Sequence, residues 1–184
     1  MPVSFGGNVV SNVSFNGNSL IRMFFNGERV FPGGITSSTA YVTVDDDYVI
    51  VNTVYGPNIP AWTSDYVSTA LMFKNFLTQP NSSLHIYGSN NIEIVDSAIV
   101  GTGMTIKYII SGVTIETKTI VVKGDVDGDG YVTMNDYSLV QDHVNQTDPI
   151  TDPAKLEAAD VDDDGQITMT DAQLIMDYWT GPSS

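Results

Sequence analysis

The sequence predicts a mainly β N-terminal part followed by a short all-α C-terminal part. Three observations lead to this fold class. Turn signals such as Asn-Gly separate short apolar runs up to residue 122. One segment within that part, residues 64–79, has the apolar spacing of a helix instead. From Gly124 onward, two acidic loops alternate with segments of helical pattern.

Residues 1–35 contain a ten-residue repeat. Residues 13–17, VSFNG, are followed by residues 23–27, MFFNG, and each Asn-Gly marks a tight hairpin turn. The pattern predicts a small three-stranded β-meander with strands at 9–15, 20–25 and 28–31. A sheet of this size cannot bury both of its faces, so we expect it to pack on the next domain, on another copy or on a larger assembly. An equally open interpretation is that it forms an extra hairpin on the neighbouring domain.

Residues 36–123 are predicted to form an Ig-like β-sandwich with one helix. A Pro-Gly-Gly hinge at 32–34 precedes this domain. The helix would be capped at Ser64 or Asp65 and would end before Pro80. Strands are expected at 40–44, 48–54, 84–87, 92–95, 104–110 and 113–122.

Two twelve-residue loops, 125–136 and 160–171, have the ligand spacing of an EF-hand calcium loop. Such a loop places oxygens at positions 1, 3, 5, 7, 9 and 12, with glycine at position 6 for the sharp turn. The second loop begins 35 residues after the first, and this repetition argues against a merely solvated acidic face. We therefore predict two Ca²⁺ ions, and we expect Val132 and Ile167 at position 8 to pair as a short strand. The predicted ligands are Asp125, Asp127, Asp129, the carbonyl of Tyr131, Thr133 and Asp136, then Asp160, Asp162, Asp164, Gln166, Thr168 and Asp171.

The charge of the chain is concentrated at its C-terminal end. Of the net charge of −15, residues 1–123 carry −2 and residues 124–184 carry −13, with Lys155 as the one basic residue of the second range. Such a density repels itself, and two divalent cations would offset part of it. Phosphate backbones and anionic lipids would be repelled too, so we expect neither nucleic acid nor membrane partners.

Cysteine is absent, so neither disulfides nor thiolate metal sites contribute. The first residues lack the basic head and apolar run of a secretory signal, and no apolar stretch is long enough to cross a bilayer. Calcium sites of modest affinity fill outside cells, so we expect an extracellular, cell-surface or virion setting.

Residues 124–184 resemble a type I dockerin. The resemblance lies in the run GDVDGDG at 124–130, in aspartate at loop position 12, in a helical segment after each loop and in the duplication itself. Helices are expected at 135–145, 153–159 and 170–179. The resemblance implies an all-α dockerin module that is non-catalytic and binds cohesin modules, as in bacterial cellulosomes.

The resemblance also implies a partner surface at positions 10, 11, 17 and 18 counted from the start of each loop. Dockerins commonly have serine or threonine in the first pair and basic residues in the second, whereas this chain has methionine at position 10 and aspartate at position 18 of both repeats. Two similar surfaces remain, and docking in two orientations is a reasonable hypothesis. The alternative is that Met134 and Met169 fill gaps in the core. The predicted contact residues are Met134, Asn135, Gln141, Asp142, Met169, Thr170, Met176 and Asp177.

No other segment predicts catalysis. His85 and His143 lack a pattern typical of a nucleophile system, and the acidic turn 45–47 lacks a partner carboxylate at a defined distance. Gly101-Thr102-Gly103 lacks the lysine of a phosphate loop and indicates a turn. Three aromatic residues are more readily explained by a core than by a sugar-stacking platform: Tyr55, Trp62 and Tyr66.

Three functions remain open. The first is a calcium-dependent attachment protein that binds a cohesin through its C-terminal module and anchors or oligomerises through its β modules. The second is a virion fibre, decoration or tail component, because residues 20–31 resemble short repeats in virion proteins of phages that infect gut-type Firmicutes. The third is a carbohydrate-binding accessory module.

Overall fold

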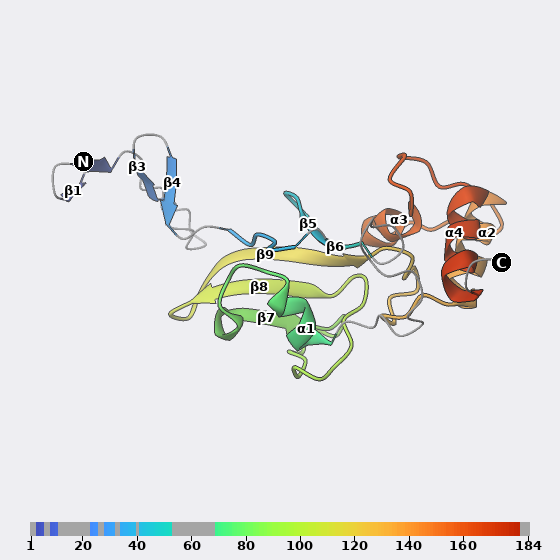
Figure 1. The fold of residues 1–184 in the computed structure, drawn as a ribbon, viewed down its shortest axis with the longest axis horizontal. Coiled ribbons are helices and arrows are strands. Elements are labelled where there is room, and N and C mark those ends of the chain that lie inside the picture. Colours follow the sequence, from blue (N-terminus) through green and yellow to red (C-terminus); the bar gives the residue numbers. More distant parts are fainter. Residues whose placement is uncertain are drawn as a thin grey trace.

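The computed structural model describes residues 3–5, 8–10, 23–25, 28–31, 34–39, 41–52 and 69–180, the first four ranges by their backbone. Near the N-terminus lies a small antiparallel sheet in the order β1-β2-β3-β4 (Figure 1). The meander was predicted with three strands, and the sheet has a fourth; its first two strands lie nearer the N-terminus than expected. Within the described ranges, its strands pair only with one another and not with the second sheet. Its strands are β1 (Val3–Phe5), β2 (Asn8–Val10), β3 (Met23–Phe25) and β4 (Glu28–Phe31).

A five-stranded mixed sheet occupies residues 42–122, in the order β5-β6-β9-β8-β7. Strand β6 runs parallel to β9, whereas the other neighbours are antiparallel. The long strand β9 runs through the middle of the sheet and ends beside the C-terminal helices (Figure 1). The strands are β5 (Val42–Val44), β6 (Tyr48–Val51), β7 (Leu84–Tyr87), β8 (Thr105–Ile110) and β9 (Val113–Val122).

The predicted Ig-like β-sandwich is wrong, because the described residues from 34 to 122 form one sheet and not two sheets packed face to face. The segment 92–95 was expected to be a strand and makes only an isolated bridge, between Tyr87 and Glu93. Ile92 and Val95 are 64% and 69% exposed, so their apolar side chains do not line a second layer. Helices cover the faces of the sheet instead.

Helix α1 (Ala70–Asn75) covers one face. Its Ala70 and Phe73 are fully buried in a cluster with side chains from β6, β7, β8 and β9. The helix begins after Thr69, whose hydroxyl accepts a hydrogen bond from the backbone N–H of Met72 at 3.3 Å. The predicted cap at Ser64 and Asp65 lies outside the described residues. A short 3-10 helix, Asn81–Ser83, leads into β7.

Helix α3 (Pro153–Ala159) packs on the opposite face of the sheet. Its Ala154 and Ala158 are buried with Ile50 of β6 and Val121 of β9. These two sheet residues alternate with neighbours that face α1, as the period of two of a strand requires. The C-terminal helices therefore share a core with the sheet.

Helices α2 (Met134–Val144) and α4 (Met169–Thr180) pack around a second cluster that includes Val140 and Ile175. The prediction of an all-α C-terminal module is wrong, because loops without helix or strand join the helices, and α3 packs on the sheet. The expected strand pair at Val132 and Ile167 is also absent among the described residues, and both side chains pack against the second cluster.

Replacing Asp152 with alanine is expected to destabilise the chain by about 1 kcal/mol, the usual cost of losing an N-cap. The Asp152 carboxylate caps α3 by accepting hydrogen bonds from the N–H groups of Ala154 at 2.9 Å and Lys155 at 3.2 Å. Urea unfolding of the intact chain measures the change. Asp148→Ala is the matched control, since it removes the same charge from an exposed position in the same loop, between α2 and α3. Equal stabilities of the two variants would contradict the capping role.

Candidate metal centre

The first acidic loop runs from the end of β9 to the start of α2, and its last carboxylate ties its two ends together. Asp136, at 0% exposure, accepts hydrogen bonds from the N–H groups of Val126 at 2.7 Å and Asp127 at 3.0 Å. Its other oxygen accepts from the N–H of Thr133 at 2.8 Å, which completes a capping box at the start of α2. The position-12 aspartate thus closes the loop.

Asp125, at position 1, is also 0% exposed. Its Oδ1 accepts from the N–H of Gly128 at 2.9 Å, and its Oδ2 accepts from Gly130 at 3.1 Å and Thr102 at 2.8 Å. Burial raises the pKa of Asp125 to about 6, against the opposing effect of the hydrogen bonds from Thr102 and Gly130, and Asp136 adds to the rise. Two buried carboxylates in one loop repel each other, and a divalent cation between them would remove this cost.

The remaining carboxylates of this loop shape its backbone. Asp127 Oδ1 accepts from the N–H of Asp129 at 3.0 Å, and Asp129 Oδ1 accepts from Tyr131 at 2.8 Å. Burial also raises the pKa of Asp127. Oxygens of Asp125, Asp127 and Asp136 lie within 4.8 Å of one another, whereas Asp129 is outside this group.

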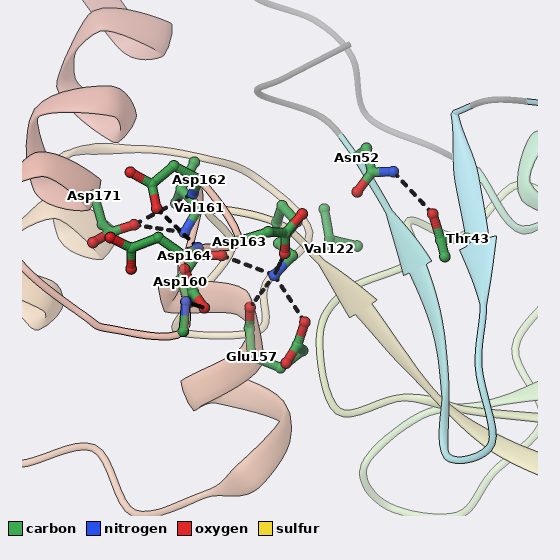
Figure 2. Close-up of polar contacts among 12 residues, drawn as sticks. Thr43, Asn52, Val122, Glu157, Asp160, Val161, Asp162, Asp163, Asp164 and Asp171 are labelled. Atoms are coloured by element: carbon green, nitrogen blue, oxygen red, sulfur yellow. Dashed lines mark hydrogen bonds and ion pairs between the residues drawn. The ribbon is translucent and has the colours of Figure 1, made fainter.

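The second loop repeats this pattern between α3 and α4. Asp171, at 0% exposure, accepts from the N–H groups of Val161 and Thr168, each at 2.8 Å. Asp164 Oδ1 accepts from the N–H of Gln166 at 2.8 Å. Figure 2 shows the carboxylates gathered in one place beside the helix that carries Asp171. The oxygens that lie within 4.8 Å of one another belong to Asp160, Asp162 and Asp164.

The residues of the second loop fit a hard divalent cation. Asp160 Oδ2 accepts from the N–H of Gly165 at 3.0 Å, but its Oδ1 is buried and has no hydrogen-bond partner in the described part of the chain. Buried polar atoms normally have a partner, and burial raises the pKa of this carboxyl group. The donors offered here are oxygens alone, and several protein oxygens in one flexible loop suit Ca²⁺ better than Mg²⁺ or a thiolate-seeking metal. A cation would supply the partner that Asp160 Oδ1 lacks.

A lysine outside the acidic clusters donates a hydrogen bond to the backbone of each loop. Lys123, just after β9, forms ion pairs with Glu157 at 2.8 Å and with Asp163 at 2.6 Å. Its ammonium also donates to the carbonyl of Asp160 at 2.8 Å. Burial lowers the pKa of Lys123, but the hydrogen bonds to Asp163 and Glu157 outweigh this effect and raise it. In Figure 2, Asp163 points towards Glu157 and Val122, away from the other carboxylates.

At the first loop, the ammonium of Lys155 in α3 donates to the carbonyl of Asp127 at 3.0 Å. Each loop therefore receives one lysine, and each of these lysines bonds a backbone carbonyl of its loop.

The predicted partner residues lie on α2 and α4. Met169 is 43% exposed, which contradicts its alternative placement in the core, and Met134 is half-buried. Both position-18 aspartates have partners within the chain: Asp142 accepts from the Thr147 hydroxyl at 2.9 Å, and Asp177 from the Gln173 amide at 2.7 Å. Asn135 and Thr170 are exposed, and Gln141 and Met176 are half-buried.

The groups considered for catalysis have structural roles where the structure describes them. His85 pairs with Glu93 at 2.7 Å, and His143 Nδ1 accepts from the N–H of Ile150 at 3.0 Å. Asp45 Oδ1 caps its own turn by accepting from the N–H of Asp47 at 2.8 Å. The aromatic residues 55, 62 and 66 lie outside the described residues. Among the helices that the structure describes, none is long and apolar enough to cross a membrane.

The sequence did not predict the hydrogen bond from the Thr102 N–H to Asp125, because the two residues are 23 positions apart in the chain. The available signal was the Gly-Thr-Gly run at 101–103, which indicated only a turn. Nothing local in the sequence links this turn to the acidic loop.

Comparisons with known proteins address the C-terminal part of the chain. Neither the curated proteins nor the solved structures gave a match. Residues 123–179, which include both acidic loops and helices α2, α3 and α4, match the family model of the dockerin type I domain, and this confirms the resemblance drawn from the loops.

Proposed function

We propose that this chain is a calcium-dependent attachment protein, whose dockerin part holds two Ca²⁺ ions and binds a cohesin-type partner. Dockerin domains are non-catalytic modules of protein–protein interaction that bind calcium. The observation that carries the proposal is the pair of acidic clusters within the matched residues, one of which leaves a buried carboxylate oxygen without a partner. The twelve predicted ligands fill the same loop positions in both repeats.

In this proposal calcium acts on structure and not on chemistry. The loops precede α2 and α4, so an ion in each loop would hold the start of each helix in place. The carboxylates of Asp136 and Asp171 then serve two purposes, as loop-closing hydrogen-bond acceptors and as ligands. Millimolar calcium favours an extracellular or surface location.

The proposed domain division is 1–35, 36–123 and 124–184, with the first two anchoring or oligomerising the protein. The docking face would consist of the position 10, 11, 17 and 18 residues on α2 and α4. Because the chain has aspartates where other dockerins commonly have basic residues, we expect its cohesin to lack the acidic patch that would pair with such residues.

Binding to an immobilised type I cohesin is expected to require calcium and to be lost in EGTA. If the two surfaces are alternatives, Met134→Asp or Met169→Asp alone should weaken binding by about tenfold or less, and the double variant should abolish it. Surface plasmon resonance with the intact chain measures both effects. Ile92→Asp is the control, since it introduces the same charge at an apolar residue that is 64% exposed on the sheet part.

The outcomes of this experiment separate the elements of the proposal. Calcium binding without capture by any cohesin of a representative panel would reject the proposed partner and retain the calcium sites. Abolition by one single variant would reject docking in two orientations. Equal loss with Ile92→Asp would reject the proposed face.

A second candidate, a virion component that displays a dockerin, is favoured by the small N-terminal sheet. Four strands of three or four residues form a sheet of their own, and a sheet of this size needs a partner surface to be stable. A symmetric oligomer in light scattering of the intact chain, lost on deletion of residues 1–33, would support assembly through this sheet. A monomer in both cases would contradict it.

A further inference from the structure

The turn at Gly101 and Thr102, which precedes β8, lies directly against the first acidic loop. The N–H of Thr102 donates to Asp125 Oδ2 at 2.8 Å, and the contact is buried. The Thr102 hydroxyl is itself held by the end of β9, since it donates to the carbonyl of Val122 at 3.2 Å and accepts from its N–H at 3.0 Å. The sheet therefore fixes the direction in which the N–H of Thr102 points.

Glycines allow the two backbones to come this close. A Cβ on Gly101 would lie 2.9 Å from both the Gly128 carbonyl carbon and the Gly130 nitrogen. A Cβ on Gly128 would lie 2.7 Å from the carbonyl oxygen of Thr102, and one on Gly130 would lie 2.8 Å from that of Val100. These are contacts with backbone atoms, which cannot rotate aside, so the loop and the turn fit only without side chains.

Among the residues that the structure describes, the second loop has no such neighbour. A Cβ on Gly165, the equivalent of Gly130, would meet none of their atoms within 4 Å. At position 4, where the first loop has Gly128, the second has Asp163, whose side chain pairs with Lys123. Asp160 accepts one hydrogen bond where Asp125 accepts three, and its Oδ1 has no partner. The two loops match in sequence and differ in their surroundings.

We propose that the Gly101–Thr102 turn is part of the first calcium site, with the Thr102 amide as a positioning residue for the Asp125 carboxylate. This inference rests on the proposed calcium function. The sheet pre-organises the first loop, so the affinity of the first site depends on residues outside the dockerin match, whereas that of the second site does not. Calcium in the first loop accordingly strengthens the junction between sheet and helices.

Calcium titration calorimetry on intact chains with one loop disabled tests the proposal. With the second loop disabled by Asp162→Ala, Gly101→Ala should weaken the remaining site by about tenfold to a hundredfold, as lost supporting contacts around metal ligands do. With the first loop disabled by Asp127→Ala, Gly101→Ala should leave the remaining site within about twofold, as expected for sites that do not share partners.

Gly88→Ala is the matched control in both backgrounds. A Cβ there would meet only side-chain atoms closely, the nearest being Asn90 Oδ1 at 3.3 Å, and Gly88 lies in the turn after β7. It should leave both sites within about twofold. Equal weakening of both sites by Gly101→Ala, or of neither, would overturn the proposal.

Amide hydrogen exchange in the unsubstituted chain gives a second measurement that needs no variant. Calcium should slow exchange at the Thr102 amide, while the Gly88 amide, which donates to the carbonyl of Ile92 at 3.0 Å, should not change. Unchanged exchange at Thr102 in a chain that binds calcium would contradict this inference alone. A chain that binds no calcium would contradict the proposed function as well.

Discussion

Chelating calcium from the intact chain is expected to unfold the C-terminal helices, the largest effect that we predict. Residues 124–184 carry a net charge of −13, and Asp125, Asp136 and Asp171 are fully buried carboxylates. A ligand at about 1,000 times its dissociation constant stabilises the folded state by about 4 kcal/mol per site, so two sites amount to a large share of a small domain's stability. EGTA should therefore abolish much of the helical circular dichroism signal, and calcium should restore it.

The loss of structure in EGTA should affect the C-terminal helices and not the sheet. The core between the sheet and α1 contains no residue of the acidic loops. Val140 and Ile175 lie in the second cluster, which also contains residues of both loops. In EGTA, we expect the amide resonances of Val140 and Ile175 to collapse to unfolded positions and that of Ile106 in β8 to remain dispersed. Magnesium at equal concentration is the control, since it accepts such flexible oxygen cages poorly. Identical melting curves in EGTA and calcium would contradict the proposed sites.

Asp136→Ala is expected to have the second-largest effect. The substitution leaves the N–H groups of Val126, Asp127 and Thr133 without their acceptor. The N–H of Val126 is buried and those of Asp127 and Thr133 are half-buried. A buried donor left unpaired costs about 1–3 kcal/mol, so we expect a loss of about 3 kcal/mol in calcium. The first turn of α2 also loses its capping box.

Chemical unfolding in calcium and in EGTA tests the role of this aspartate. In EGTA the C-terminal helices are expected to be unfolded in both chains, so the deficit of the variant against the unsubstituted chain should nearly vanish. Asp171→Ala should behave alike, because Asp171 makes the equivalent bonds to Val161 and Thr168. A deficit in calcium below about 0.5 kcal/mol, the range of ordinary surface substitutions, would refute the structural role.

Local signals in the sequence predicted many elements well. Strands β7 and β9 and helix α3 have the bounds that alternation, turn residues and Pro153 indicated. The match of residues 123–179 to the dockerin family model confirms the resemblance that the two loops and the helical segments after them indicated. Such features depend on residues within about a dozen positions of each other, where periodicity and turn chemistry operate.

Strand partners were harder to predict. Nothing local shows that β6 runs parallel to β9, whose paired residues lie 71 positions further along the chain, and the sandwich prediction failed there. Ile92 and Val95 have strand-like composition, yet their side chains are exposed, and the described residues form no second sheet that includes them. Composition reports the tendency of a segment to be extended, whereas its partner depends on the whole fold.

By itself, the sequence determined the two acidic loops, because position-specific oxygens and a glycine at position 6 are local requirements of the chain. Only the tertiary structure decided that the loops differ. The turn at Gly101 and Thr102 meets one loop and not the other, and α3 packs on the sheet through Ala154 and Ala158. The physical reason is that hydrogen bonds and close packing act between residues that are near in space, and folding alone brings Thr102 to Asp125.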